Sequence, residues 1–218
     1  MFRQILSLQW KSSRMTTLVG VFAAFALPIL SVRTWSPAEG RVIDIQEQLI
    51  AIQQWGVAYP TLAAVLGFIL AMTAWGADHR GKHIYALTLP VPRWYYVLLK
   101  LGAGAVLLAA PIVALWFGSI LATTTAAIPT GLDGYAGALT LRFALASLIA
   151  YAGFFAISAG TNRIAGYVLG VLAGVIATQI LIDAAGFDVN IIEHIVVWLF
   201  NPPSPFEIFG GRWVLIDV

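Results

Sequence analysis

The chain has 218 residues, of which 60% are hydrophobic and only 10% are charged. A soluble domain carries about 25% charged residues to keep its surface hydrated, so this composition excludes an ordinary soluble fold. The formal net charge of +2 is too small to indicate a nucleic-acid partner. The chain has no cysteine, which excludes disulfides, thiolate metal sites and cysteine nucleophiles. No polar linker divides the chain, so residues 1–218 are predicted to form a single transmembrane domain.

The first residues have the pattern of an amphipathic helix. Apolar residues recur at helical spacing, and the basic and polar residues fall on other faces. The apolar positions are Phe2, Ile5, Leu6 and Trp10. This pattern predicts a helix that lies in the headgroup region before the chain enters the membrane. The alternative is an ordinary frayed terminus whose basic residues only set the topology.

Five stretches are long and apolar enough to cross a bilayer, and none contains Asp, Glu, Lys or Arg. They are Met15–Val32, Gly56–Ala77, Leu101–Thr123, Phe143–Asn162 and Ile164–Ile182. A helical span needs about 20 apolar residues, because a helix rises about 1.5 Å per residue through a hydrocarbon core about 30 Å thick. The first stretch is longer than the apolar core of a secretory signal peptide, which is the other interpretation of a basic N-terminus followed by an apolar run. We therefore expect an all-α polytopic membrane protein with five complete transmembrane helices.

Basic residues predict the orientation, because Lys and Arg in short loops are retained on the cytoplasmic side. Segments on the N-terminal side of the membrane hold Arg3, Lys11, Arg14, Arg80, Lys82, Arg93, Lys100 and Arg163, whereas the other side holds Arg33, Arg41, Arg142 and Arg212. Eight basic residues against four predict a cytoplasmic N-terminus and a location in the cell's inner (cytoplasmic) membrane.

Outside the predicted spans, two segments have helical spacing and are too short to cross the membrane. Val42–Ile50 predicts a short amphipathic helix on the outer side. Asn190 and Glu193 form a predicted capping box that opens a helix over Ile191–Phe200, which we expect to be interfacial or re-entrant. Prolines at 202, 203 and 205 then end this helix, and an apolar run beginning near residue 212 predicts a partial sixth span.

The fifth predicted span carries glycines at a spacing of four residues: Gly166, Gly170 and Gly174. This spacing clears one stripe of the helix surface of side chains and favours close packing of another helix. We interpret the stripe as a helix-packing surface.

No motif indicates chemistry in this chain. Gly76–His83 fits the spacing of a phosphate-binding loop, but it ends in His instead of Ser or Thr and follows an apolar helix instead of a strand. His79 and His83 lack a third metal ligand at a recognised spacing. No predicted span has an ionisable residue near its midpoint, which argues against proton-coupled transport and ion conduction. We therefore expect no catalytic residue, no cofactor and no metal site, and we do not expect an enzyme.

The segment Asp78–Lys100 resembles the coupling loop of permeases from type-2 ATP-binding-cassette (ABC) exporters. It has an acidic residue at the end of the second span, a glycine three residues later, a short helix with Ala-Leu, then Leu-Pro-x-x-Arg and a lysine seven residues on. The matching residues are Asp78, Gly81, Ala86, Leu87, Leu89, Pro90, Arg93 and Lys100. The chain departs from the family at Lys82, where the family usually has Thr, and in its incomplete sixth span.

The resemblance implies that this loop docks on a separate ATPase subunit. Its candidate coupling residues are Asp78, Arg80, Gly81, Leu87, Leu89, Pro90 and Arg93. The implied function is the permease subunit of an ABC exporter that works with an ABC-type ATPase and with a second permease chain, as a homodimer or a heterodimer. The alternative is a non-catalytic structural subunit of a larger membrane complex. The residues do not identify a transported substrate.

Overall fold

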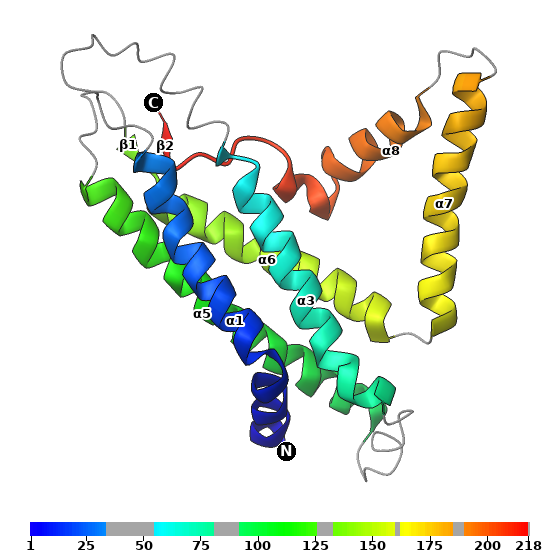
Figure 1. The fold of residues 1–218 in the computed structure, drawn as a ribbon, viewed down its shortest axis with the longest axis horizontal. Coiled ribbons are helices and arrows are strands. Elements are labelled where there is room, and N and C mark those ends of the chain that lie inside the picture. The colour runs from blue at the N-terminus through cyan, green and yellow to red at the C-terminus, as the bar shows by residue number, and fades with distance from the viewer. Residues whose placement is uncertain (34–54, 81–91, 126–132, 160–161, 185–189, 218) are drawn as a thin grey trace.

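The computed structural model describes residues 1–33, 55–80, 92–125, 133–159, 162–184 and 190–217, and these residues are mostly helical (Figure 1). The helices are α1 (Phe2–Arg33), α3 (Ala58–Arg80), α5 (Arg93–Thr125), α6 (Ala136–Ala159), α7 (Asn162–Ala184) and α8 (Ile191–Phe200), with a 3₁₀ turn η1 (Pro205–Phe209) and two short strands, β1 (Asp133–Gly134) and β2 (Ile216–Asp217). The all-α class predicted from the sequence is therefore confirmed apart from this one two-residue strand pair.

Helices α1, α3, α5 and α6 form a four-helix bundle in which α1 packs mainly along α5 and α3 mainly along α6. The chain begins at one end of this bundle, where α3 also ends and α5 begins (Figure 1). We call this the N-terminal end. The interior of the bundle is filled by large side chains that are almost completely buried, among them Leu108, Leu115, Phe143 and Tyr151. Burial of these groups holds the four helices together.

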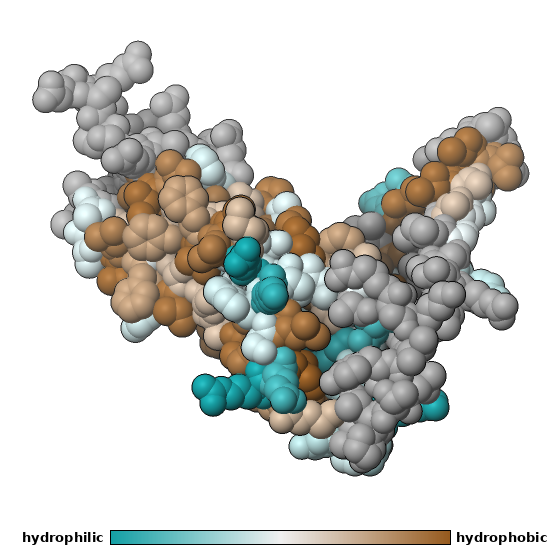
Figure 2. All heavy atoms as spheres, turned by 60° about the horizontal axis from the view of Figure 1, so that its bottom comes forward, coloured by the Kyte–Doolittle hydropathy of each residue, from teal (hydrophilic) through white to brown (hydrophobic). Residues whose placement is uncertain are grey.

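The four helices of the bundle are long and apolar enough to cross a membrane. Many large apolar side chains on them are exposed, including Val19 and Phe22 at 66% and 73%. Figure 2 shows hydrophobic surface over much of the described residues on the face that it draws. A continuous apolar surface of this kind is unfavourable in contact with water but stable in contact with lipid. The structure thus supports a membrane protein with four candidate spans.

The predicted count of five complete spans plus a partial sixth is not supported. Within the described part of α7, the apolar run that stands out is Ala173–Ile182, which is too short to cross a bilayer. The prediction that a sixth helix starts near residue 212 is wrong. Ile216 instead belongs to β2, which pairs antiparallel with β1. Trp213, Leu215 and Ile216 are buried, because this segment lies extended on the bundle and its apolar side chains join the core.

The N-terminal helix and the first span, predicted as two elements, form the single helix α1. Figure 1 shows that its first turns lie at an angle to the rest of α1. The other helices also extend beyond the apolar runs. Helix α5 begins at Arg93 and not at Leu101, so Lys100 lies within a candidate span.

The predicted helix cap at Asn190 is confirmed, since its side-chain oxygen accepts a hydrogen bond from the Glu193 amide at 3.0 Å. Gln179 of α7 accepts a further hydrogen bond from the Ile191 amide at 2.7 Å. Two of the free amides at the start of α8 are thereby satisfied. Any helix over Val42–Ile50 lies outside the described residues.

Close helix packing occurs at glycines that the sequence analysis did not select. A Cβ added at Gly67 would lie 2.7 Å from the Tyr151 backbone nitrogen on α6, and one added at Gly118 would collide with the Phe25 carbonyl on α1. By contrast, a Cβ at Gly170 or Gly174 would meet no described atom within 4 Å. Helix α7 stands apart from the bundle (Figure 1). The predicted packing stripe therefore has no partner helix in the described part of this chain, and the surroundings of Gly166 lie outside that part.

Candidate functional site

A buried ion pair joins α3 to α5 at the N-terminal end of the bundle. The Lys100 ammonium lies 2.7 Å from Oδ2 of Asp78, and the two side chains are only 3% and 5% exposed. The hydroxyl of Tyr96 donates to both carboxylate oxygens of Asp78 at 3.2 Å. Tyr96 and Lys100 are four residues apart on α5, so they share the helix face that meets the end of α3. A buried charge pair of this kind is stable only where its geometry and hydrogen bonds are good.

Aromatic rings line the buried ammonium. Its nitrogen lies 4.4 Å from the centre of the Trp75 ring and 5.2 Å from that of the Tyr96 ring. The faces of aromatic rings carry negative charge density and attract a cation within about 6 Å. Trp75 and Asp78 are three residues apart on α3, so one face of this helix supplies both the counter-ion and an aromatic wall.

The backbone carbonyl of Lys100 links the same point to the other two helices of the bundle. Nε2 of Gln9 on α1 donates to this carbonyl at 3.2 Å, and the Tyr151 hydroxyl on α6 donates to it at 3.3 Å. All four helices of the bundle therefore meet at Lys100. We call Gln9, Trp75, Asp78, Tyr96, Lys100 and Tyr151 the Lys100 cluster.

A cavity of about 570 Å³ opens beside this cluster, between the first turns of α1, the end of α3 and the start of α5. Its described lining comes from the N-terminus and the first three turns of α1, the last turns of α3 and the first turns of α5: Met1, Gln4, Ile5, Ser7, Leu8, Gln9, Lys11, Ser12, Thr73, Ala74, Asp78, Tyr96 and Lys100. Figure 2 turns this end of the molecule toward the viewer and shows small groups of hydrophilic residues among hydrophobic ones. The site thus offers a polar and apolar surface to a ligand or a moving segment.

The predicted coupling residues fall partly at this site. Asp78 is a member of the cluster, and Arg93 is the first residue of α5 and is exposed. Arg80 ends α3, with its side chain outside the description. Gly81, Leu87, Leu89 and Pro90 lie outside the described residues, as do His83 and most of the segment that resembles a coupling loop. The structure brings together Asp78 and Lys100, which are 22 residues apart in the chain.

Sequence reasoning missed most of the Lys100 cluster. It matched Lys100 only as the last position of a motif, and it placed the third span after this residue. The spacings Trp75–Asp78 and Tyr96–Lys100 were the available signal, because each places two side chains on one helix face. Gln9 and Tyr151 gave no local signal, since their partner is a backbone carbonyl on a distant helix.

A second polar site lies at the opposite end of the bundle. Arg142 of α6 donates to the Ile208 carbonyl at 3.1 Å and to the carbonyls of Gly210 and Arg212, and its guanidinium lies 4.9 Å from the centre of the Trp213 ring. These bonds hold the extended C-terminal segment against the bundle. The site has the character of a structural anchor.

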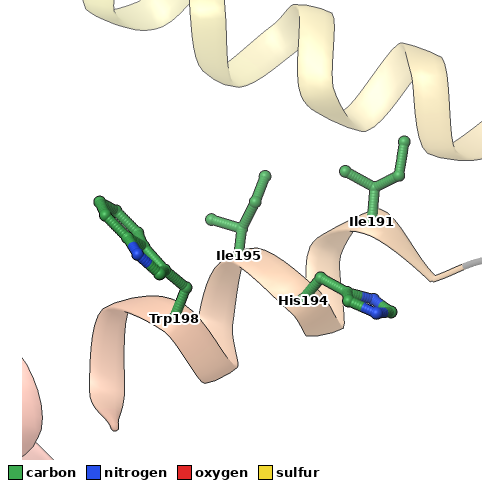
Figure 3. A pocket seen from close by; sticks show the side chains of 4 residues that line it. All are labelled: Ile191, His194, Ile195 and Trp198. Carbon is green, nitrogen blue, oxygen red and sulfur yellow. The ribbon is translucent and has the colours of Figure 1, made fainter. Parts of the chain in front are cut away.

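A third, apolar site lies on α8, and its described lining comes from this helix. Figure 3 shows Ile191, Ile195 and Trp198 pointing from α8 toward α7, with His194 turned aside. They line a cavity of about 270 Å³. The His194 Nδ1 lies 2.7 Å from the Asn190 carbonyl oxygen of the same helix. The lining of this cavity is mainly hydrophobic, and its described residues form no group of reactive side chains.

Comparison of the chain with known protein families, with curated proteins and with solved structures finds no match. Among the three sites, the Lys100 cluster is the one that joins all four bundle helices beside the segment singled out by the sequence. Movement of either helix end at this cluster would separate two charged groups that are almost completely buried, so the movement is expected to carry the partner helix with it. The arrangement can therefore transmit a local displacement to the whole bundle.

Proposed function

We propose that this chain is the membrane-spanning permease subunit of an ABC exporter, in which ATP hydrolysis takes place on a separate ATPase subunit. The resemblance of Asp78–Lys100 to a coupling loop supports this assignment. So does the membrane character of the helices. In this proposal the whole of α7, which is 23 residues long, is a fifth span beyond the four candidate spans of the bundle. The N-terminus is cytoplasmic, and the chain pairs with a second permease chain.

The observation that carries the proposal is the buried bond between the two ends of the candidate coupling loop. Asp78 lies just before residues 81–91 and Lys100 follows them, and their side chains meet at 2.7 Å. A force applied to the loop by the ATPase would therefore move α3 and α5 together. Gln9 and Tyr151 would pass the same displacement to α1 and α6, since both donate to the Lys100 carbonyl. Rigid-body motion of packed helices about such a junction is a common way to switch between states.

The experiment is co-expression of the tagged chain with an ABC-type ATPase encoded beside it. We expect the intact chain to capture the ATPase, and a chain lacking residues 82–90 to lose it while keeping its helical circular dichroism and its monodisperse elution. Asp133→Asn, a charge removal at the opposite end of the bundle, is the matched control and should leave capture unchanged. Capture of the ATPase by the loop-deleted chain would overturn the proposal.

The competing candidate is a structural subunit of a larger membrane complex. It is favoured by the exposed apolar surface of α7, where Tyr167 is 73% exposed and Gly170 and Gly174 have open space around them. Such a surface suits a partner helix of any membrane protein. If the purified chain carries non-ATPase membrane proteins and captures no ATPase, this candidate replaces the exporter assignment.

A further inference from the structure

We propose that the cavity beside the Lys100 cluster binds the headgroup of an anionic glycerophospholipid, a phosphate diester that carries a free hydroxyl group. In this proposal Lys11 pairs with the phosphate and the side-chain oxygen of Gln9 accepts the hydroxyl. The inference goes beyond the exporter assignment and does not depend on it, because it concerns a site within the described residues and requires no ATPase.

The cavity has the size and the position of a headgroup site. Its volume of about 570 Å³ lies within the range of about 300–1,000 Å³ that is usual for small-ligand sites. It opens between the first turns of α1, the end of α3 and the start of α5. The amphipathic pattern of residues 2–13 predicts that these turns lie at headgroup depth. A lipid can therefore reach the cavity from the membrane with its chains still in the hydrocarbon layer.

Gln9 supplies a buried acceptor that lacks a donor. Its side chain is 5% exposed, and its Nε2 is engaged with the Lys100 carbonyl at 3.2 Å. Its Oε1 is buried and has no hydrogen-bond partner among the described residues, and Gln9 is one of the residues that line the cavity. A buried amide oxygen without a donor is costly, so a ligand that presents a hydroxyl group there is favoured.

The charges of the lining favour an anion. Asp78 and Lys100 neutralise each other across 2.7 Å. The cationic groups of the described lining that are left without a counter-ion inside it are the exposed Lys11 ammonium and the N-terminal ammonium of Met1. An anionic phosphate diester can pair with Lys11 and lie within the field of both.

Apolar walls distinguish a lipid from a free phosphate ester. Ile5, Leu8 and the Tyr96 ring line the same cavity as the polar groups. A soluble headgroup would leave these surfaces without apolar contact, whereas the glycerol backbone and first methylenes of a lipid would cover them. The observations therefore favour the intact lipid as the source of the phosphate diester.

The test measures lipid binding to the purified full chain in mild detergent, by native mass spectrometry during titration with phosphatidylglycerol. Phosphatidylcholine, which lacks the hydroxyl and the net negative charge, and soluble glycerophosphoglycerol, which lacks the acyl chains, are the comparison ligands. We expect one tightly bound phosphatidylglycerol per chain and much weaker binding of the other two. Lys11→Gln should weaken the binding about fivefold, the usual contribution of one basic residue beside an anionic lipid.

Arg14→Gln is the matched control, because Arg14 is also exposed on α1 but lies outside the lining. It should change the affinity by less than about twofold, since a screened charge that makes no contact contributes little. Gln9→Leu should also weaken binding, and the melting temperature without lipid will show whether this variant is folded. Equal loss in the Arg14 and Lys11 variants, or equal binding of phosphatidylcholine, would overturn the site. Tight binding of glycerophosphoglycerol would overturn the lipid as its source.

Discussion

Substitution of Asp78 by asparagine removes the counter-ion of Lys100 while keeping the size of the side chain. Loss of one partner of a buried ion pair costs about 3–5 kcal/mol of folding free energy, because the remaining charge stays away from water. Both side chains are 5% exposed or less, which places this pair in that class. The Trp75 ring, 4.4 Å from the ammonium, would still attract it. We therefore expect a loss near the lower limit, about 3 kcal/mol.

Lys100→Met tests the opposite half of the pair. It leaves the Asp78 carboxylate with only the Tyr96 hydroxyl as a donor in the described structure, at 3.2 Å. We expect a loss of about 3–5 kcal/mol for this variant as well. The double variant should lose far less than the sum of the two single losses, because it leaves no unpaired charge behind.

The assay is reversible unfolding of the purified chain in mixed micelles with rising fractions of sodium dodecyl sulfate, followed by tryptophan fluorescence. Asp133→Asn serves as the control, since Asp133 is exposed in β1 and its loss should change the free energy of unfolding by less than about 0.5 kcal/mol. Additive losses in the double variant, or single losses as small as that of the control, would refute the argument that the pair is buried and coupled.

Two further predictions concern helix packing and the C-terminal anchor. Gly118→Leu should destabilise the chain by more than about 2 kcal/mol in the same unfolding assay, because the new leucine side chain must displace α1 at the Phe25 carbonyl. Gly153→Leu is the control and should be nearly neutral, since Gly153 has open space around it. Arg142→Gln should release the C-terminal segment from the bundle. The chain has no cysteine, so a single Leu215→Cys substitution at this buried position reports release through its rate of reaction with maleimide. We expect this rate to be at least about tenfold higher with Gln at residue 142 than with Arg, which corresponds to a loss of about 1.4 kcal/mol of anchoring free energy. Equal rates in the two backgrounds would contradict the anchoring role.

The sequence was sufficient for the membrane character of the chain and for the approximate positions of the six helices α1, α3, α5, α6, α7 and α8. A run of about 20 apolar residues without charge has no stable alternative in water, so it predicts a span from local information alone. The boundaries were less predictable. Helices α1 and α5 extend past their apolar runs into Arg3 and Arg93, because a helix can continue into polar surroundings wherever its backbone bonds are satisfied.

Local sequence information was not sufficient to predict the conformation of the C-terminal segment. The apolar run after residue 212 resembles the start of a span in composition, yet it forms an extended strand that packs on the core. Its conformation depends on pairing with Asp133–Gly134 and on Arg142, which lie more than 60 residues earlier in the chain. The periodicity and composition of a segment contain no information about contacts with such distant residues.

Helix packing and the candidate site were decided in the same way by tertiary contacts. The glycine spacing in α7 was visible in the sequence, but close packing occurs at Gly67 and Gly118, because those glycines lie where two backbones cross. Likewise, the sequence alone shows that Asp78 and Lys100 flank a loop. Only the folded bundle brings their charges within 2.7 Å and surrounds them with groups from all four helices. Apolar length is a local property that determines what enters the membrane, whereas the burial and pairing of polar groups depend on which helices meet.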